Sequence, residues 1–205
     1  MSWPTPWPPP VPDSPDLAGL LAGPVLEVAP RLLGAVFRHG DVAVRLTEVE
    51  AYDGAGDPGS HAYRGRTARN ATMFGPAGHL YCYFTYGMHV CCNVVCGPEG
   101  TASAVLVRAG EVVEGVDLAR RRRERASDRD LARGPARLCR ALGIGLTHDG
   151  EDLIGGGAIS LTLGERVGTV STGPRVGLRG APDRPWRFWV TGERSVSTYR
   201  PAKRL

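Results

Sequence analysis

One stretch decides that the fold is built on antiparallel strands: HLYCYFTYGMHVCCNVVCG, residues 79–97. It contains two runs rich in aromatic and β-branched residues, which favour the pleated backbone of a strand. The runs flank Tyr86-Gly87-Met88, a segment short enough to form the turn of a hairpin. Residues 79–97 therefore predict a β-hairpin with Tyr86 at or near its tip.

Upstream of the hairpin, residues 41–52 also predict a strand, because apolar residues alternate with less apolar neighbours. If the alternation continued unbroken, one face would carry Val42, Val44, Leu46, Glu48, Glu50 and Tyr52. A buried charge without a partner is costly. We therefore expect this strand either to run out to a solvated rim or to end in a functional site.

The remaining pattern predicts an α/β fold of the α+β kind. It is a single compact domain, with a curved, mostly antiparallel sheet flanked by helices and a protruding β-hairpin. Further strands are expected at 35–38, 102–109, 158–163 and 187–191, and helices at 17–21, 24–34, 114–126 and 135–142. The segment Ser14-Pro15 is expected to cap the first helix. Residues 53–78 predict a long loop, and loops of this length are usually functional.

Composition limits the class of protein. The chain has 205 residues, 42% hydrophobic and 22% charged, which is typical of one soluble globular domain. No apolar run is long enough to cross a bilayer, and the N-terminus does not resemble a secretion signal. We expect a cytoplasmic protein, nucleoid-associated if bacterial, with a flexible proline-rich tail at 1–13 and a domain at 14–205.

The net charge of +4 comes almost entirely from arginine, since Lys203 is the only lysine. Arginine suits phosphate recognition, so a nucleic-acid partner fits this balance without being established by it. The RRRRER run at 120–125 is expected to form a solvated helix face, with contact to backbone phosphate as the alternative.

The five cysteines are odd in number and form no C-x-x-C pair. They are Cys82, Cys91, Cys92, Cys96 and Cys139. We expect them to be buried apolar thiols rather than metal ligands or disulfides. No cofactor or metal is therefore predicted, and an iron–sulfur or zinc role remains the alternative.

Two features suggest chemistry on nucleic acid. An aromatic residue at a hairpin tip, Tyr86, could act as a wedge between base steps, although it could also fold back on the loop at 53–78. Glu50 could pair with Arg108, expected near the end of the strand at 102–109, and so remain ionised. The alternative is a purely structural Glu–Arg pair.

The chain resembles the alkyladenine (3-methyladenine) DNA glycosylase family over residues 16–200. The resemblance is carried by EAY at 50–52, SHA at 60–62, GRTARNATMFGPAGHLYCYFTYGMHVCCNVV at 65–95, LVRAGE at 106–111, GPARLCRALGI at 134–144, PRVGLRGA at 174–181 and PWRFWVTG at 185–192. His89 stands where some relatives carry an aromatic residue that supports the wedge.

The resemblance implies a role for each matching residue. Glu50 would activate the attacking water, which Arg108 and the backbone carbonyl of Val176 would help to hold. The pocket for a flipped base would be formed by Tyr52, His61, Tyr83 and Asn93, and the wedge by Tyr86 with Met88 beside it. Candidates for contact with the DNA backbone are Gly177, from the resemblance, and Arg64, Arg66 and Arg69, which adjoin the expected pocket. Glu48 is expected to support the site from behind or to face solvent.

The implied function is a monofunctional DNA glycosylase, acting as a monomer on double-stranded DNA that contains damaged purines. The substrates would be alkylated or deaminated purines such as 3-methyladenine, 7-methylguanine, hypoxanthine and ethenoadenine. A single lysine at the far C-terminus gives no obvious nucleophile for a lyase step. Two alternatives remain open: a small-nucleoside glycosidase that uses Glu48 and Glu50 as a carboxylate pair, and a non-catalytic module that binds damaged DNA.

Overall fold

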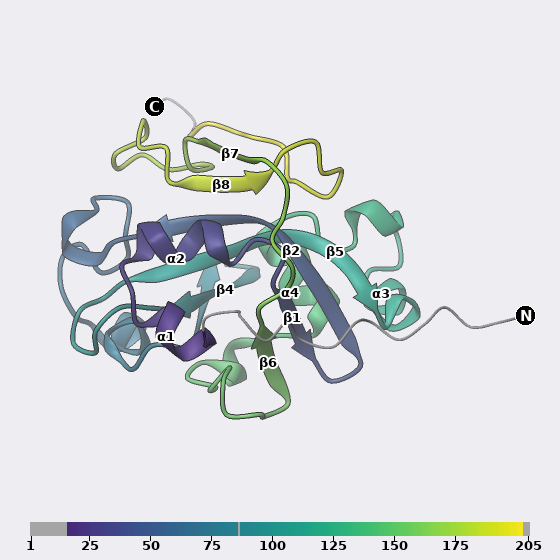
Figure 1. The fold of residues 1–205 in the computed structure, drawn as a ribbon, viewed down its shortest axis with the longest axis horizontal. Helices are drawn as coiled ribbons and strands as arrows, with labels where there is room; N and C mark the ends of the chain where they lie inside the picture. Colours follow the sequence, from purple (N-terminus) through teal and green to yellow (C-terminus); the bar gives the residue numbers. More distant parts are fainter. Residues whose placement is uncertain (1–15, 86, 203–205) are drawn as a thin grey trace, which may run out of the picture.

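The structure is a computed structural model that describes residues 16–85 and 87–202. Its strands form one antiparallel sheet with the order β3-β4-β5-β2-β1-β6, extended by β8 on β2 and β7 on β8 (Figure 1). The strands are β1 (Val36–His39), β2 (Val42–Tyr52), β3 (Leu80–Thr85), β4 (His89–Val95), β5 (Ala104–Glu114), β6 (Ile159–Thr162), β7 (Val170–Gly173) and β8 (Arg187–Val190). The predicted fold class is confirmed.

Four α-helices and four 3-10 helices accompany the sheet in the part of the chain that the structure describes. The α-helices are α1 (Leu17–Leu21), α2 (Val25–Arg31), α3 (Val116–Arg122) and α4 (Pro135–Leu142), and the 3-10 helices are η1 (Gly54–Gly56), η2 (Ala68–Phe74), η3 (Asp128–Asp130) and η4 (Leu146–His148). Figure 1 shows α1 and α2 toward one end of the long strands β2 and β5, and α3 toward the other end. The segment predicted as an irregular loop thus contains η1 and η2.

The hairpin of β3 and β4 is confirmed, with Leu80 paired to Val94 and Thr85 paired to His89. On its other edge β4 pairs with β5, so the hairpin is the outer edge of the sheet rather than a free appendage. Tyr86, which the sequence predicts at or near the tip, lies outside the described residues, as does the predicted tail at 1–13.

The prediction that one face of residues 42–52 carries both the apolar residues and the acids is wrong. The register of β2 against β5 is irregular twice in succession, between Leu46 and Glu48 and between Glu48 and Val49, so that Thr47 of β2 forms a β-bulge and Arg108 of β5 is also unpaired. A bulge inserts one residue and reverses the alternation of side chains. Consequently the main hydrophobic core contains Val42, Val44 and Leu46 before the bulge but Val49 and Ala51 after it. Glu48, Glu50 and Tyr52 therefore point to the opposite face.

The two faces of the sheet beyond the bulge have different roles. The core face carries Val49 and Ala51 with their partners on β5, Val107 and Val105, and packs against the buried side of α4. The site face carries Glu50 and its cross-strand neighbours. Because directly paired residues share a face, the site face contains a row of Tyr81, Asn93, Leu106, Glu50 and Arg187 across five strands.

Three further predictions need correction. β5 extends to Glu114, so Arg108 lies in the middle of that strand rather than near its end. α3 spans Val116–Arg122, and the arginine run therefore continues beyond the helix. The cap of α1 is Asp16, whose side chain accepts from the backbone N–H of Ala18 at 3.3 Å.

Candidate active site

Glu50 lies on β2 with a fully buried side chain. Its Oε1 accepts a hydrogen bond from the backbone N–H of Val176 at 2.7 Å, and its Oε2 accepts one from Oη of Tyr52 at 2.9 Å. Nη1 of Arg108 forms an ion pair with Oε1 at 3.2 Å. A carboxylate has about four acceptor directions, so these three donors leave about one for a further molecule.

Arg108 connects Glu50 to Glu48. While its Nη1 faces Glu50, its Nε donates to Oε1 of Glu48 at 2.9 Å. Both carboxylates raise the pKa of Arg108 despite the opposing effect of burial, so the guanidinium stays charged. The predicted pairing of Glu50 with Arg108 is present, and it is part of a larger network than the sequence indicated.

Glu48 is fully buried, so the expectation that it could face solvent is wrong. Besides Arg108, it accepts from Nε of Arg187 at 2.7 Å, and from the backbone N–H of Ser197 at 2.6 Å and its Oγ at 2.9 Å. Burial alone would raise the pKa of Glu48, but the charges of Arg108 and Arg187 outweigh it and lower the pKa. Glu48 therefore joins β2, β5, β8 and the C-terminal segment behind the site.

Tyr52 is held between Glu50 and a buried arginine. The guanidinium carbon of Arg175 lies 4.6 Å from the centre of the Tyr52 ring. Burial is the main reason that the pKa of Tyr52 is raised well above its ordinary value, and the charge of Glu50 adds to it. The phenol therefore remains protonated and able to donate its hydrogen bond to Glu50.

Arg175 itself is fixed by a buried ion pair with Asp57. Its Nη2 donates to Oδ1 of Asp57 at 2.7 Å, its Nη1 also contacts that carboxylate, and Nη1 donates to the carbonyl of Ala51 at 2.9 Å. Such a bidentate pair is geometrically specific. Because Arg175 precedes Val176 in the chain, this pair fixes the segment whose N–H reaches Glu50.

An aromatic wall stands beside the carboxylate. The rings of Tyr83 and His61 meet edge to face with centroids 4.6 Å apart, and Tyr81 stacks on Tyr83 at 5.6 Å. Burial raises the pKa of Tyr83, with smaller contributions from Cys91 and from the charge of Glu50. The pKa of His61 is lowered by partial burial and by nearby Arg69, which favours a neutral ring.

Asn93 belongs to the same face of the sheet. It is buried, and its Nδ2 donates to the carbonyl of Tyr81 at 3.3 Å. Asn93 and Glu50 both pair with Leu106, from opposite sides of β5. The structure thus brings Glu50, Arg108, Tyr52 and Val176 into direct contact and places Tyr83, His61 and Asn93 alongside them.

The hairpin and the loop that precedes it present exposed groups. Met88 is 69% exposed and Phe84 45% exposed, an unusual degree for large apolar side chains at one end of a hairpin. The predicted wedge Tyr86 lies outside the described residues. Arg64, Arg66 and Gly177, three of the candidates for backbone contact, are exposed, and the fourth, Arg69, donates to the carbonyl of Phe84 at 2.9 Å.

Sequence reasoning missed the residues that hold the site together. These are Asp57, Tyr81, Arg175, Arg187 and Ser197. The segments PRVGLRGA and PWRFWVTG contain Arg175 and Arg187, but the pattern gave no indication of their partners. All five cysteines are free and buried. Within residues 16–85 and 87–202, no group of three potential metal-ligating side chains is found, and no helix is both long and apolar enough to cross a membrane.

Comparison with known proteins agrees with the geometry. A model of the methylpurine-DNA glycosylase family matches residues 20–194. A protein of Leifsonia xyli subsp. xyli is 60% identical over 188 residues, covering 85% of this chain and 88% of the relative. A Streptomyces avermitilis protein is 56% identical over 189 residues, covering 87% and 89%. A Frankia casuarinae protein is 52% identical over 203 residues, covering 93% and 96%. All three carry the provisional name 3-methyladenine DNA glycosylase. The buried carboxylate and its aromatic wall therefore belong to a member of the methylpurine-DNA glycosylase family.

Proposed function

We propose that the protein is a monofunctional DNA glycosylase that flips alkylated or deaminated purines out of duplex DNA and hydrolyses the N-glycosidic bond. It would thereby start base excision repair as a monomer. The observation that carries this proposal is the buried Glu50 carboxylate, held by Tyr52, Val176 and Arg108 beside an aromatic wall.

Glu50 is the proposed general base. Water would approach the free acceptor direction of the carboxylate and give it a proton, while the water oxygen bonds to the anomeric carbon of the sugar. The C–N bond breaks and its electron pair stays with the leaving base. Negative charge on Glu50 also stabilises the oxocarbenium-like sugar that forms as the bond breaks.

The aromatic wall is the proposed base pocket. The faces of Tyr52, Tyr83 and His61 can stack on a flipped purine, and aromatic faces favour an electron-poor or cationic ring. Alkylated purines such as 3-methyladenine carry this charge and leave readily. Asn93 is the proposed residue that crowds the 2-amino group of guanine and so disfavours the normal base.

The hairpin end is the proposed wedge. Exposed Met88 and Phe84 offer apolar surface that could take the place of lost base stacking, with Tyr86 between them in the sequence. Arg64, Arg66 and Arg69 follow His61 closely and are the proposed phosphate contacts on this side.

The surroundings of Glu48 argue against a glycosidase with two catalytic carboxylates. An inverting pair needs a second carboxylate that can reach substrate or water. Glu48 already accepts four hydrogen bonds, from Arg108, from Arg187 and from the backbone N–H and Oγ of Ser197, which occupy its acceptor directions. A supporting role for Glu48 fits these contacts better than a catalytic one.

The test uses duplex oligonucleotides that contain one hypoxanthine or one ethenoadenine, incubated with wild-type protein or Glu50→Gln, then with alkali to cleave abasic sites. We expect strand cleavage with wild type only. The matched control is Glu165→Gln, which removes an exposed carboxylate and should cleave like wild type. Lesion-selective binding without cleavage of either substrate, or of methylated DNA, would instead favour the non-catalytic binder.

A further inference from the structure

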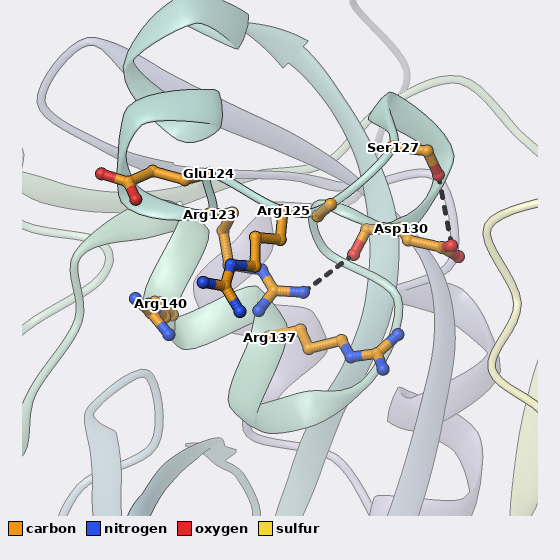
Figure 2. A pocket seen from close by; sticks show the side chains of 8 residues that line it. Arg123, Glu124, Arg125, Ser127, Asp130, Arg137 and Arg140 are labelled. Carbon is orange, nitrogen blue, oxygen red and sulfur yellow. Dashed lines mark hydrogen bonds between the residues drawn. The ribbon is translucent and has the colours of Figure 1, made fainter.

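A basic pocket lies between the end of α3 and the outer side of α4. Its lining residues are Arg123, Glu124, Arg125, Ala126, Ser127, Asp130, Arg137 and Arg140, around a cavity of about 480 Å³ (Figure 2). None of the residues assigned to the candidate active site lines it. Four guanidinium groups and two carboxylates therefore share one small volume.

The acidic members of the pocket do not neutralise its arginines. Asp130 is already paired with Arg129 at 3.3 Å and with Arg133 at 3.3 Å, neither of which lines the cavity. Figure 2 shows the carboxylate of Glu124 on the far side, away from the guanidinium groups. The pocket is therefore strongly electropositive.

Only one of the four arginines has a structural task. Arg123 donates to the carbonyls of Leu131 at 3.2 Å and Asp130 at 3.3 Å. Among residues 16–85 and 87–202, no hydrogen-bond or ion-pair partner is found for the side chains of Arg125, Arg137 and Arg140, which are all exposed. Burial and then the charges of Arg137 and Arg140 lower the pKa of Arg123, so the cluster repels itself without a bound anion.

The arginines of the sequence run at 120–125 thus have two different roles. Arg120 forms ion pairs with Asp117 and Asp128, both at 2.7 Å, and Arg122 donates to the carbonyl of Ala141 at 2.8 Å. These two side chains support local structure. Arg123 and Arg125, beyond the end of α3, instead meet Arg137 and Arg140 of α4 at the pocket.

The pocket and the candidate active site lie on opposite sides of the sheet. The buried side of α4, with Leu138 and Cys139, packs on the core face together with Val105 and Val107. Arg137 and Arg140 are on the exposed side of the same helix, one layer farther from the site face. Duplex DNA is stiff over about 150 base pairs, so a short duplex engaged at Glu50 cannot curve around to reach them.

We propose that this pocket is a second nucleic-acid site, which holds phosphates of a DNA segment other than the one in the active site. Arginine forks match phosphate oxygens in geometry and charge. No aromatic side chain lines the pocket, so we expect phosphate contacts to dominate there and binding to be independent of sequence and damage. Holding two segments would let the protein transfer between them without full release.

The test measures capture of a second duplex. Beads carrying a short undamaged duplex are loaded with full-length protein and washed, and a fluorescent undamaged duplex is then added. The variant is Arg125→Gln/Arg137→Gln/Arg140→Gln. The matched control, Arg31→Gln/Arg166→Gln/Arg194→Gln, removes three exposed arginines that do not line the pocket. No step requires base release, so the outcome does not depend on the proposed catalysis.

We expect wild type and control to retain the second duplex and the pocket variant to lose it by about tenfold or more. The slope of log affinity against log salt should fall by about 2 to 3, since each phosphate contact contributes about 0.9. Equal thermal unfolding midpoints establish that all three proteins are folded, and sedimentation establishes that no dimer bridges the two duplexes.

Three results would overturn the proposal. The first is that wild type and pocket variant retain the second duplex equally. The second is that the control variant loses the second duplex as much as the pocket variant does. The third is binding of inorganic pyrophosphate to wild type, abolished in the pocket variant, without any capture of a second duplex. That result would assign the pocket to a free phosphate compound instead of the DNA backbone.

Discussion

Glu48 and Glu50 are identical side chains two positions apart on β2, yet their surroundings assign them different tasks. Both carboxylates are fully buried, but Glu48 accepts from Arg108, Arg187 and Ser197. Glu50 shares Arg108 but receives its other donors from Tyr52 and Val176, next to the aromatic wall. At the scale of the residue, the number of donors around each carboxylate is the reason that we propose support for Glu48 and catalysis for Glu50.

Replacing Tyr52 by Phe should slow base release while leaving the ring in place. The change removes the hydrogen bond from Oη to Oε2 of Glu50, and bonds to charged groups are worth about 1.5–3 kcal/mol. We expect the single-turnover rate constant for base release from a hypoxanthine duplex to fall about 10- to 100-fold. Tyr63→Phe, at a 47% exposed tyrosine, is the control. An unchanged rate constant in Tyr52→Phe would show that this hydrogen bond does not orient the Glu50 carboxylate.

Replacing Glu48 by Gln should mainly destabilise the fold. The change leaves buried Arg187 without its counter-charge and leaves Arg108 with Glu50 alone, and removing one member of a buried ion pair typically costs about 3–5 kcal/mol. Urea unfolding should therefore show a loss of about 3 kcal/mol or more. Where the variant is folded, it should retain measurable turnover, unlike Glu50→Gln.

The control for Glu48 is Glu193→Gln, which breaks a partly exposed ion pair with Arg45 at 2.9 Å. Such pairs contribute about 1 kcal/mol or less. Complete loss of turnover in a stable, folded Glu48→Gln protein would revive the two-carboxylate mechanism.

At the scale of the element, the β-bulge at Thr47 decides where the site lies. If the alternation continued unbroken from Leu46, Glu50 would point toward the core face, and Val49 and Ala51 would point away from it. Gly110 of β5 is paired with Leu46 at this irregularity. A side chain there would meet Val44 and the backbone of Arg45, so the glycine is required by close approach of the two strands.

Gly110→Ala should therefore lower stability. Its added methyl group cannot fit without shifting backbone, and overpacking of this kind typically costs about 1–3 kcal/mol. Gly19→Ala in α1 is a suitable control, because nothing lies within 4 Å of the position and alanine is the better helix former. Chemical denaturation should show a lower free energy of unfolding than wild type for Gly110→Ala and a higher one for Gly19→Ala. Equal stability of Gly110→Ala and wild type would contradict the close approach.

At the scale of the whole molecule, two buried carboxylates join distant parts of the chain. Glu48 connects β2 to the segment at Ser197, and Asp57 connects the first long loop to Arg175. The pKa of Asp57 is lowered because Arg175 outweighs the effect of burial, and the pKa of Glu48 is lowered by its arginines in the same way. The fold should therefore be sensitive to acid.

The sign of this pH dependence follows from the lowered pKa values. Each carboxylate contributes its full stabilisation above its unfolded pKa, about 4.5 for Glu48 and 3.8 for Asp57, and loses it as the pH falls through the lower folded pKa. We expect the free energy of unfolding to drop steeply below about pH 4.5. Asp57→Asn should be less stable at pH 7 and show a shallower decline in acid. If the free energy of unfolding fell in parallel with pH for wild type and Asp57→Asn, Asp57 would not be a source of the acid sensitivity.

The sequence by itself determined the strands with clear alternation, the β3–β4 hairpin, the helix closed by Gly143, and the resemblance that singles out Glu50. These depend on local pattern and on motifs of neighbouring residues. The strand expected at 102–109 instead continues through Gly110 to Glu114, and the close contact of Gly110 with β2 left no local signal. The bulge at Thr47 left no local signal either.

Only the tertiary structure decided which face carries the acids and what surrounds them. The donor to Oε1 of Glu50 is 126 residues away, and the anchor of Glu48 at Ser197 is 149 residues away. The Asp57–Arg175 pair and the arginine pocket between α3 and α4 likewise join segments that local pattern treats separately. Ion pairs and hydrogen bonds in this protein depend on where the folded sheet brings its side chains, and periodicity along the chain does not contain that information.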